Sequence, residues 1–189
     1  MKYKIAATVI AVLLGIFALV FAASYANQYW IHRYDELIAR QSLVYGLDEK
    51  LVWSIINEES YFSAWKIGAD DEVGLMQVTP LVAREWAKTT GLEQFEQRVN
   101  ADLEKFLRDP ERNIQVGCWY LESLRTSYRG YPAEIAMTLA AYNAGPSRVT
   151  EWTKTTDIAK ISESEFINRI DIPSTKSYVT SILEHYREN

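Results

Sequence analysis

The longest apolar stretch of the chain lies near its N-terminus, where residues 5–23 contain no charged side chain. A helix rises about 1.5 Å per residue, so a helix over this stretch spans the roughly 30 Å apolar core of a bilayer. Lys2 and Lys4 precede it, and basic residues favour the cytoplasmic side. We therefore expect a cytoplasmic tip at residues 1–4 and a transmembrane anchor at 5–23.

Residues 24–34 carry Tyr25, Tyr29 and Trp30, which are residues that favour the membrane interface. We expect this segment to form a juxtamembrane stalk. A signal peptide cleaved after Ala26 is the alternative, although the apolar run is longer than the usual core of such a peptide. Both interpretations place the rest of the chain outside the cytoplasm, on the periplasmic or cell-wall side of the cell membrane.

From Asp35 onward, the spacing of apolar residues and of capping residues predicts one helix after another. Asp48, Thr79-Pro80, Asp109-Pro110 and Tyr131-Pro132 mark helix starts, and Ser162 with Glu165 has the spacing of a capping box. No stretch alternates as a strand does, apart from a small β-like piece expected within residues 62–73. The predicted fold is mainly α, and its helices run over residues 35–45, 48–59, 80–88, 110–127, 131–142, a short piece from 162, and 174–185.

Composition narrows the chemistry that this domain, residues 35–189, can perform. Cys118 is the only cysteine, and His32 and His185 are the only histidines. A thiolate metal site or a nucleophile activated by histidine is therefore not expected, and we predict no metal and no cofactor. The net charge of −5 also disfavours nucleic acid as a partner. Among the chemistries considered, catalysis by carboxylate side chains is the one that remains.

One carboxylate occupies an unusual helical position. On a helix turning by about 100° per residue, one apolar face is formed by Leu51, Val52, Ile55 and Ile56. Glu59 falls at the centre of that face, whereas Glu58 falls at its edge. Partial burial raises the pKa of a carboxyl group, as a general acid near neutral pH requires. The alternative is a structural glutamate that bonds a buried partner.

The residues around Glu59 resemble the catalytic segment of the soluble lytic transglycosylase domain, a lysozyme-like family that cuts peptidoglycan. The matching features are Glu59-Ser60, then Gly74-Leu75-Met76-Gln77 and Pro80. Further blocks follow in the family's order at residues 113–124 (NIQVGCWYLESL), 139–146 (LAAYNAGP) and 172–179 (IPSTKSYV). The resemblance covers about residues 40–187 and implies a lysozyme-like helical domain.

The resemblance also implies a reaction and a set of site residues. Glu59 would act as the single acid and base in cleaving the bond between N-acetylmuramic acid and N-acetylglucosamine, leaving a 1,6-anhydro end. Peptidoglycan glycan strands would be the partner, besides the membrane. The implied substrate-binding residues are Ser60, Met76, Gln77, Tyr142, Asn143 and Tyr178. All of them except Asn143 also have a purely structural interpretation.

Two departures from the family pattern leave alternatives open. The family usually has a Ser-Pro-x-Gly-Ala-like stretch where this chain has residues 68–73 (GADDEV), and Glu-Thr where it has Ser174-Thr175. A second carboxylate is therefore missing at position 174. A muramidase that hydrolyses the same bond, like goose-type lysozyme, and a catalytically weak peptidoglycan-binding module are the alternatives.

Overall fold

The computed structural model describes residues 2–91 and 93–188. The chain divides into two compact units, of which one ends at Tyr34 and the other begins at Asp35. Each unit is described by itself.

The first unit is a single helix, α1, from Lys2 to His32. The side chains of residues 8–23 are exposed, and the helical stretch that begins at Lys2 is long and apolar enough to cross a membrane. A signal sequence near an N-terminus can also meet this criterion of length and composition. Most of the expected stalk at residues 24–34 is helical, because α1 continues through it without a break.

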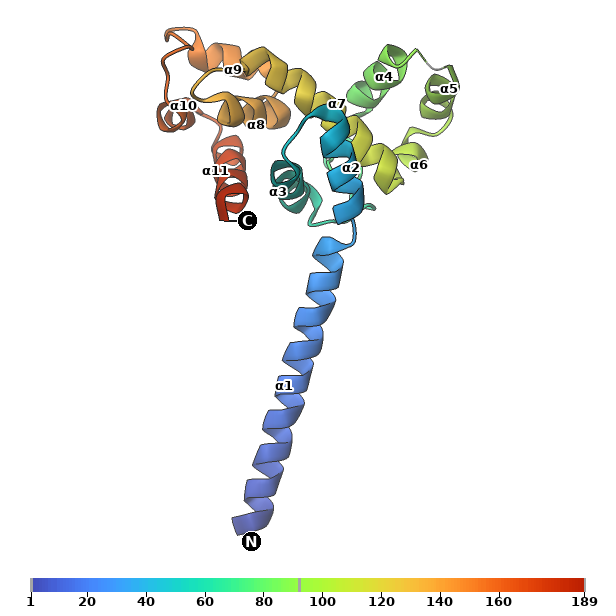
Figure 1. The fold of residues 1–189 in the computed structure, drawn as a ribbon, viewed down its shortest axis with the longest axis vertical. Helices are drawn as coiled ribbons and strands as arrows, with labels where there is room; N and C mark the ends of the chain where they lie inside the picture. Colours follow the sequence, from blue (N-terminus) through green and yellow to red (C-terminus); the bar gives the residue numbers. More distant parts are fainter. Residues whose placement is uncertain (1, 92, 189) are drawn as a thin grey trace. The chain divides into compact units, whose positions relative to one another are not determined.

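In its described residues, the second unit consists of helices joined by turns and loops, with isolated β-bridges in place of strands. The prediction of a mainly α fold is therefore confirmed. The helices of its described residues, labelled in Figure 1, are α2 (Asp35–Tyr45), α3 (Glu49–Ser60), α4 (Pro80–Thr89), α5 (Glu93–Ala101), α6 (Leu103–Arg108), α7 (Pro110–Tyr128), α8 (Glu134–Ala144), α9 (Pro146–Thr153), α10 (Glu163–Arg169) and α11 (Pro173–Glu188).

Helix α7 is the centre of this unit. It contacts α2, α4, α6 and α8, and in Figure 1 it runs between the lobe of α4 to α6 and the group of α8 to α11. Ile114, Cys118 and Leu121 on α7 are fully buried. Helix α11 packs against α3 and α8. Tyr178 in its first half lies at the end of α3, and Tyr186 near its C-terminal end lies at the start of α3, where its hydroxyl bonds Asp48.

The helix starts follow the capping residues identified in the sequence. The side chains of Asp48, Thr79 and Asp109 each accept a hydrogen bond from a backbone N–H in the first turn that follows. Ser162 and Glu165 form the predicted capping box. These local signals are correct because a cap satisfies groups within its own turn and needs no distant partner.

Other predictions of helix position were incomplete. Helices α5, α6 and α9 were not predicted. Helix α9 begins directly at Pro146, since Gly145 reverses the chain at φ 88° and proline fits the first turn of a helix. Helix α8 begins at Glu134 rather than residue 131, because residues 131–133 form a turn in which the Glu134 N–H donates to Tyr131 O. The β-like piece exists, but it lies at residues 67–78 rather than within 62–73.

Candidate active site

Helix α3 ends one residue after Glu59, and the chain then turns sharply. Tyr61 caps the helix at φ 48°, with its N–H donating to Asn57 O at 3.0 Å, and Phe62 follows at φ 60°. This left-handed backbone costs about 1 kcal/mol or more at a residue with a side chain. Phe62 is fully buried, and its ring lies 5.0 Å from that of Trp53. Packing therefore holds the turn that fixes Glu59 at the end of the helix.

A short hairpin follows this turn. The Gly74 N–H donates to Lys66 O at 2.9 Å, and the Gly68 N–H donates to Glu72 O at 2.8 Å. The Lys66 ammonium group in turn donates to the backbone carbonyl oxygen of Glu59. The hairpin is thus attached to the last turn of α3 beside the catalytic candidate.

Asn113 on α7 anchors the hairpin from inside the domain. Its side chain is fully buried, and its Oδ1 accepts from Met76 N at 2.8 Å. Its Nδ2 donates to Val73 O at 2.7 Å and to Leu107 O at 2.8 Å. A Cβ atom at Gly74 would lie 2.3 Å from that Nδ2, so the backbone can approach Asn113 only because residue 74 is glycine.

Glu59 is partly buried, and its carboxylate has one direct side-chain partner. The hydroxyl of Tyr178, on α11, donates to Glu59 Oε1 at 2.7 Å. Burial raises the pKa of Glu59 to about 7, whereas the Tyr178 hydrogen bond and the positive charge of Lys66 pull it down. The negative charges of Glu72 and Glu58 add to the upward shift. Near neutral pH, this carboxyl group is therefore divided between its protonated and ionised forms.

The neighbouring Glu58 is held in a different way. Ser181, one turn further along α11 than Tyr178, donates from its hydroxyl to Glu58 Oε2 at 2.6 Å. Both glutamates therefore bond to α11, but a serine holds one and a tyrosine the other. Burial and the Glu59 charge raise the pKa of Tyr178 well above its usual range, so the phenol remains a proton donor in this bond.

Helix α8 brings Tyr142 and Asn143 to the same region. The Tyr142 hydroxyl donates to Met76 O at 2.8 Å, and burial followed by the Glu59 charge raises its pKa well above the usual range. Asn143 is exposed, and its Oδ1 accepts from Thr175 at 2.7 Å. Thr175, which matches the family pattern, thus links α11 to α8 next to Ser174, where the family usually has a carboxylate.

Three of the predicted binding residues make contacts within the protein. The side chain of Met76 is fully buried, and a Cβ at Gly117 would lie 2.4 Å from its sulfur, so Met76 packs in the core. Ser60 is 6% exposed, and its hydroxyl is bonded to Leu75 O at 2.8 Å. Its role is therefore structural as well.

Gln77, at φ 44°, donates from Nε2 to Gly74 O at 2.9 Å and to Lys66 O at 3.2 Å. Its amide N–H groups thus stabilise the turn, while the side chain remains partly exposed.

Sequence reasoning did not assign roles to Asn113, Lys66 and Glu72. Asn113 is the first residue of the NIQVGCWYLESL block. The family resemblance therefore marked its position but assigned it no role. Glu72 lies in residues 68–73, which depart from the family pattern. That departure was the sequence feature that could have drawn attention to it. Lys66 carried no signal, because its contact with Glu59 depends on how the hairpin folds back.

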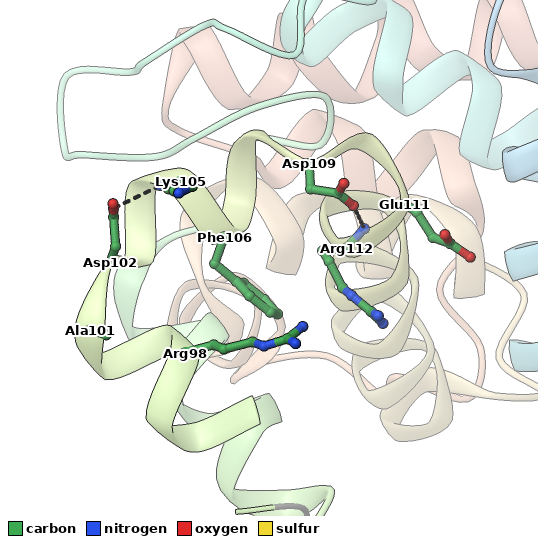
Figure 2. A pocket seen from close by; sticks show the side chains of 8 residues that line it. All are labelled: Arg98, Ala101, Asp102, Lys105, Phe106, Asp109, Glu111 and Arg112. Atoms are coloured by element: carbon green, nitrogen blue, oxygen red, sulfur yellow. Dashed lines mark hydrogen bonds between the residues drawn. The ribbon is translucent and has the colours of Figure 1, made fainter. Parts of the chain in front are cut away.

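A cavity of about 540 Å³ lies elsewhere, at the junction of α5, α6 and α7. Figure 2 shows the side chains of Arg98, Phe106 and Arg112 extending toward one another from its walls. Asp102 and Asp109, also in its lining, act as helix caps for Lys105 N and Arg112 N. None of the predicted site residues lines this cavity.

Known proteins resemble this chain in sequence. Membrane-bound lytic murein transglycosylase C of Photorhabdus laumondii is 32% identical over 124 residues, which are 62% of this chain and 33% of that protein. The protein of the same name from Yersinia pestis is 29% identical over the same shares. The chain therefore spans about a third of the length of the curated relatives it matches.

Solved structures of lytic transglycosylases also resemble this chain. Lytic transglycosylase Slt of Pseudomonas aeruginosa, in an inactive glutamate-to-glutamine variant, has a TM-score of 0.70 at 25% identity, over 83% of this chain and 24% of its own. The 70 kDa soluble lytic transglycosylase of Escherichia coli has a TM-score of 0.69 at 26% identity, over 82% and 24%. These likenesses confirm the predicted lysozyme-like helical fold.

The family model described as the transglycosylase SLT domain matches residues 36–164, which include α2 through the start of α10 and all of the site except Tyr178 and its neighbours on α11. This match covers well over half of the chain, and the chain belongs to the transglycosylase SLT domain family.

Proposed function

We propose that this protein is a lytic transglycosylase that cleaves the glycan strands of peptidoglycan, with Glu59 as its single general acid and base. The observation that carries the proposal is the partly buried Glu59 carboxyl group, with a pKa near 7 and a hydrogen bond from Tyr178. A group that must first give and then accept a proton works best when its pKa is close to the working pH.

In the proposed reaction, protonated Glu59 gives its proton to the oxygen that bridges N-acetylmuramic acid to N-acetylglucosamine. The bond from that oxygen to C1 breaks, and the sugar's own C6 hydroxyl attacks C1. The Glu59 carboxylate takes the C6 hydroxyl proton, which returns it to its protonated form. No water is consumed, and the products are a free 4-hydroxyl and a 1,6-anhydro end.

The relatives of this chain support the proposed transglycosylase activity. The curated proteins that match carry the name murein transglycosylase, and murein is peptidoglycan. The similar Pseudomonas structure is of an inactive variant in which glutamine replaces a glutamate. A requirement for one glutamate in that protein parallels the role proposed for Glu59.

The remaining site residues divide into two groups in this proposal. Tyr178 and Tyr142 position the acid and the hairpin through their hydroxyl groups. Asn143 and Gln77 keep exposed or partly exposed side chains beside that site, and we assign them to contacts with the sugar N-acetyl groups and hydroxyls.

We also propose that α1 anchors the protein in the cell membrane by residues 5–23, with residues 1–4 in the cytoplasm, residues 24–34 as a juxtamembrane segment and the catalytic domain, residues 35–189, on the periplasmic or cell-wall side. The basic residues before the apolar run support this orientation. A substrate outside the cytoplasm requires it. The intact protein should be found in the membrane fraction. Protease added to intact spheroplasts should digest the catalytic domain, and protection of the domain from the protease would contradict the orientation.

Product analysis tests the activity. The full chain, purified in detergent, is incubated with isolated peptidoglycan, and the fragments are examined by mass spectrometry. Anhydro ends, which are lighter than reducing ends by one water, are expected from the wild type and not from Glu59→Gln. Reducing ends alone would identify a hydrolase, and binding without cleavage would identify a binding module.

A further inference from the structure

The hairpin after α3 carries two opposite charges close to Glu59. In an antiparallel pair, residues that face each other project to the same side, and the side alternates along the strand. The bridge between Ile67 and Val73 therefore places Gly68 opposite Glu72, on the same side as Lys66. Because the ammonium group of Lys66 contacts the backbone oxygen of Glu59, that side of the hairpin borders the acid.

Gly68 makes room for the Glu72 carboxylate. A Cβ atom at position 68 would lie 2.2 Å from Glu72 Oε2 and 3.0 Å from Gln77 Oε1. The same Glu72 oxygen accepts a hydrogen bond from Asp70 N at 3.0 Å, which holds the carboxylate over the glycine. A larger residue at position 68 would displace this group.

The chain's departure from its family lies at these residues. The family usually has a Ser-Pro-x-Gly-Ala-like stretch here, whereas residues 68–73 of this chain read GADDEV. The negative charge of Glu72 raises the pKa of Glu59. This stretch thus supplies a carboxylate near the acid together with the glycine that accommodates it.

We propose that Glu72 is a positioning residue of the active site, whose carboxylate, seated over Gly68, keeps Glu59 protonated up to a higher pH than Lys66 and Tyr178 alone would allow. This inference deepens the proposed function and rests on it, because it concerns the acid form of Glu59. Other groups act on the same carboxyl: Glu58 from its own helix, Lys66 from the hairpin, Tyr178 from α11 and Tyr142 from α8. Among them, Lys66 favours the ionised form and Glu58 the protonated form.

The test uses the pH dependence of peptidoglycan cleavage by the full chain in detergent. Activity falls at high pH as Glu59 loses its proton, so Glu72→Gln should move this basic limb down by roughly 0.5–1 pH unit. The maximal rate at lower pH should stay within about threefold of wild type. Asp71→Asn is the matched control, since it removes a charge from the same hairpin without acting on Glu59, and its basic limb should not move.

A second variant moves the carboxylate and keeps its charge. Gly68→Ala collides only with the flexible ends of the Glu72 and Gln77 side chains, so the fold should persist while the carboxylate shifts. Its basic limb should move in the same direction as that of Glu72→Gln, and by less. The double variant should show no larger shift than Glu72→Gln alone.

Direct titration of the Glu59 carboxyl, by carbon-13 NMR of protein labelled at glutamate, separates this inference from the proposed reaction. A lower Glu59 pKa in Glu72→Gln supports the inference even if no anhydro product forms. An unchanged Glu59 pKa in the folded variant overturns it, even if the wild type produces anhydro ends. An equal shift in Asp71→Asn also overturns it, since the effect would then come from net charge.

Discussion

The hydroxyl of Tyr178 donates a hydrogen bond to Glu59 Oε1 at 2.7 Å, although 119 residues separate the two in the sequence. The bond joins the end of α3 to α11. It orients the carboxylate and, because a phenol donor favours the charged form, opposes the effect of burial on the Glu59 pKa. Tyr178 is 6% exposed, so little water competes for the bond.

Tyr178→Phe should therefore have two separable effects. Loss of a hydrogen bond to a charged group, worth about 1.5–3 kcal/mol, should lower kcat by about tenfold or more through poorer orientation of Glu59. The pKa of Glu59 should rise, so the basic limb of the pH–rate profile should move to higher pH. A profile that keeps its wild-type position would contradict the proposed contact in solution.

The two adjacent glutamates should differ sharply in their importance. Glu59→Gln should reduce the rate of cleavage by about a thousandfold or more, because general acid and base catalysis is lost. Glu58→Gln keeps a partner for Ser181 and should stay within about threefold of wild type. Release of soluble fragments from labelled peptidoglycan measures both rates. Equal losses of activity in the two variants would contradict the proposal that Glu59, and not Glu58, is the catalytic acid.

Stability should depend on pH through Glu59. Its folded pKa of about 7 lies above the ordinary value of 4.5, so the stabilisation that this group provides is complete below pH 4.5 and is lost as pH rises through 7. The total loss is about 3 kcal/mol at most. Glu59→Gln does not ionise, so its free energy of unfolding should exceed that of wild type at pH 8.5.

At pH 4.5, the two proteins should be nearly equal in stability. Urea unfolding of the full chain in detergent, followed by tryptophan fluorescence, measures the difference at both pH values. Using the difference between the two proteins cancels the contributions of other titrating groups. A gap that is as large at pH 4.5 as at pH 8.5 would show that ionisation of Glu59 is not its source.

Asn113 should be essential for stability rather than for chemistry. Asn113→Ala leaves the buried groups Met76 N–H, Val73 C=O and Leu107 C=O without this partner, at about 1–3 kcal/mol each, so a loss of about 3 kcal/mol or more is expected. Ser127→Ala, an exposed change on the same helix, should stay within about 0.5 kcal/mol. Thermal unfolding compares them, and similar melting temperatures would show that the hairpin does not depend on Asn113.

Sequence reasoning predicted most helix starts correctly and the position of Glu59 on its helix. It failed for the lobe of α5 and α6 and for α9, where no strong signal stands out from the surrounding polar residues. Among the proposed binding residues, it could not separate Met76 and Ser60, which are buried, from Asn143, which is exposed. A motif marks where in the chain a site lies, but burial depends on which helices pack over it.

By itself, the sequence determined the features that depend on neighbouring residues: the apolar N-terminal run, the caps at Asp48 and Asp109, and the placement of Glu59 rather than Glu58 at the centre of a helical face. These follow from interactions within one or two turns. Only the tertiary structure decided that Tyr178 bonds Glu59, that Asn113 anchors the hairpin, and that Glu72 lies beside the acid over Gly68. The first two contacts join segments that are distant in the chain, and their geometry is set by how α3, α7 and α11 pack together. The third depends on how the hairpin after α3 folds back toward Glu59.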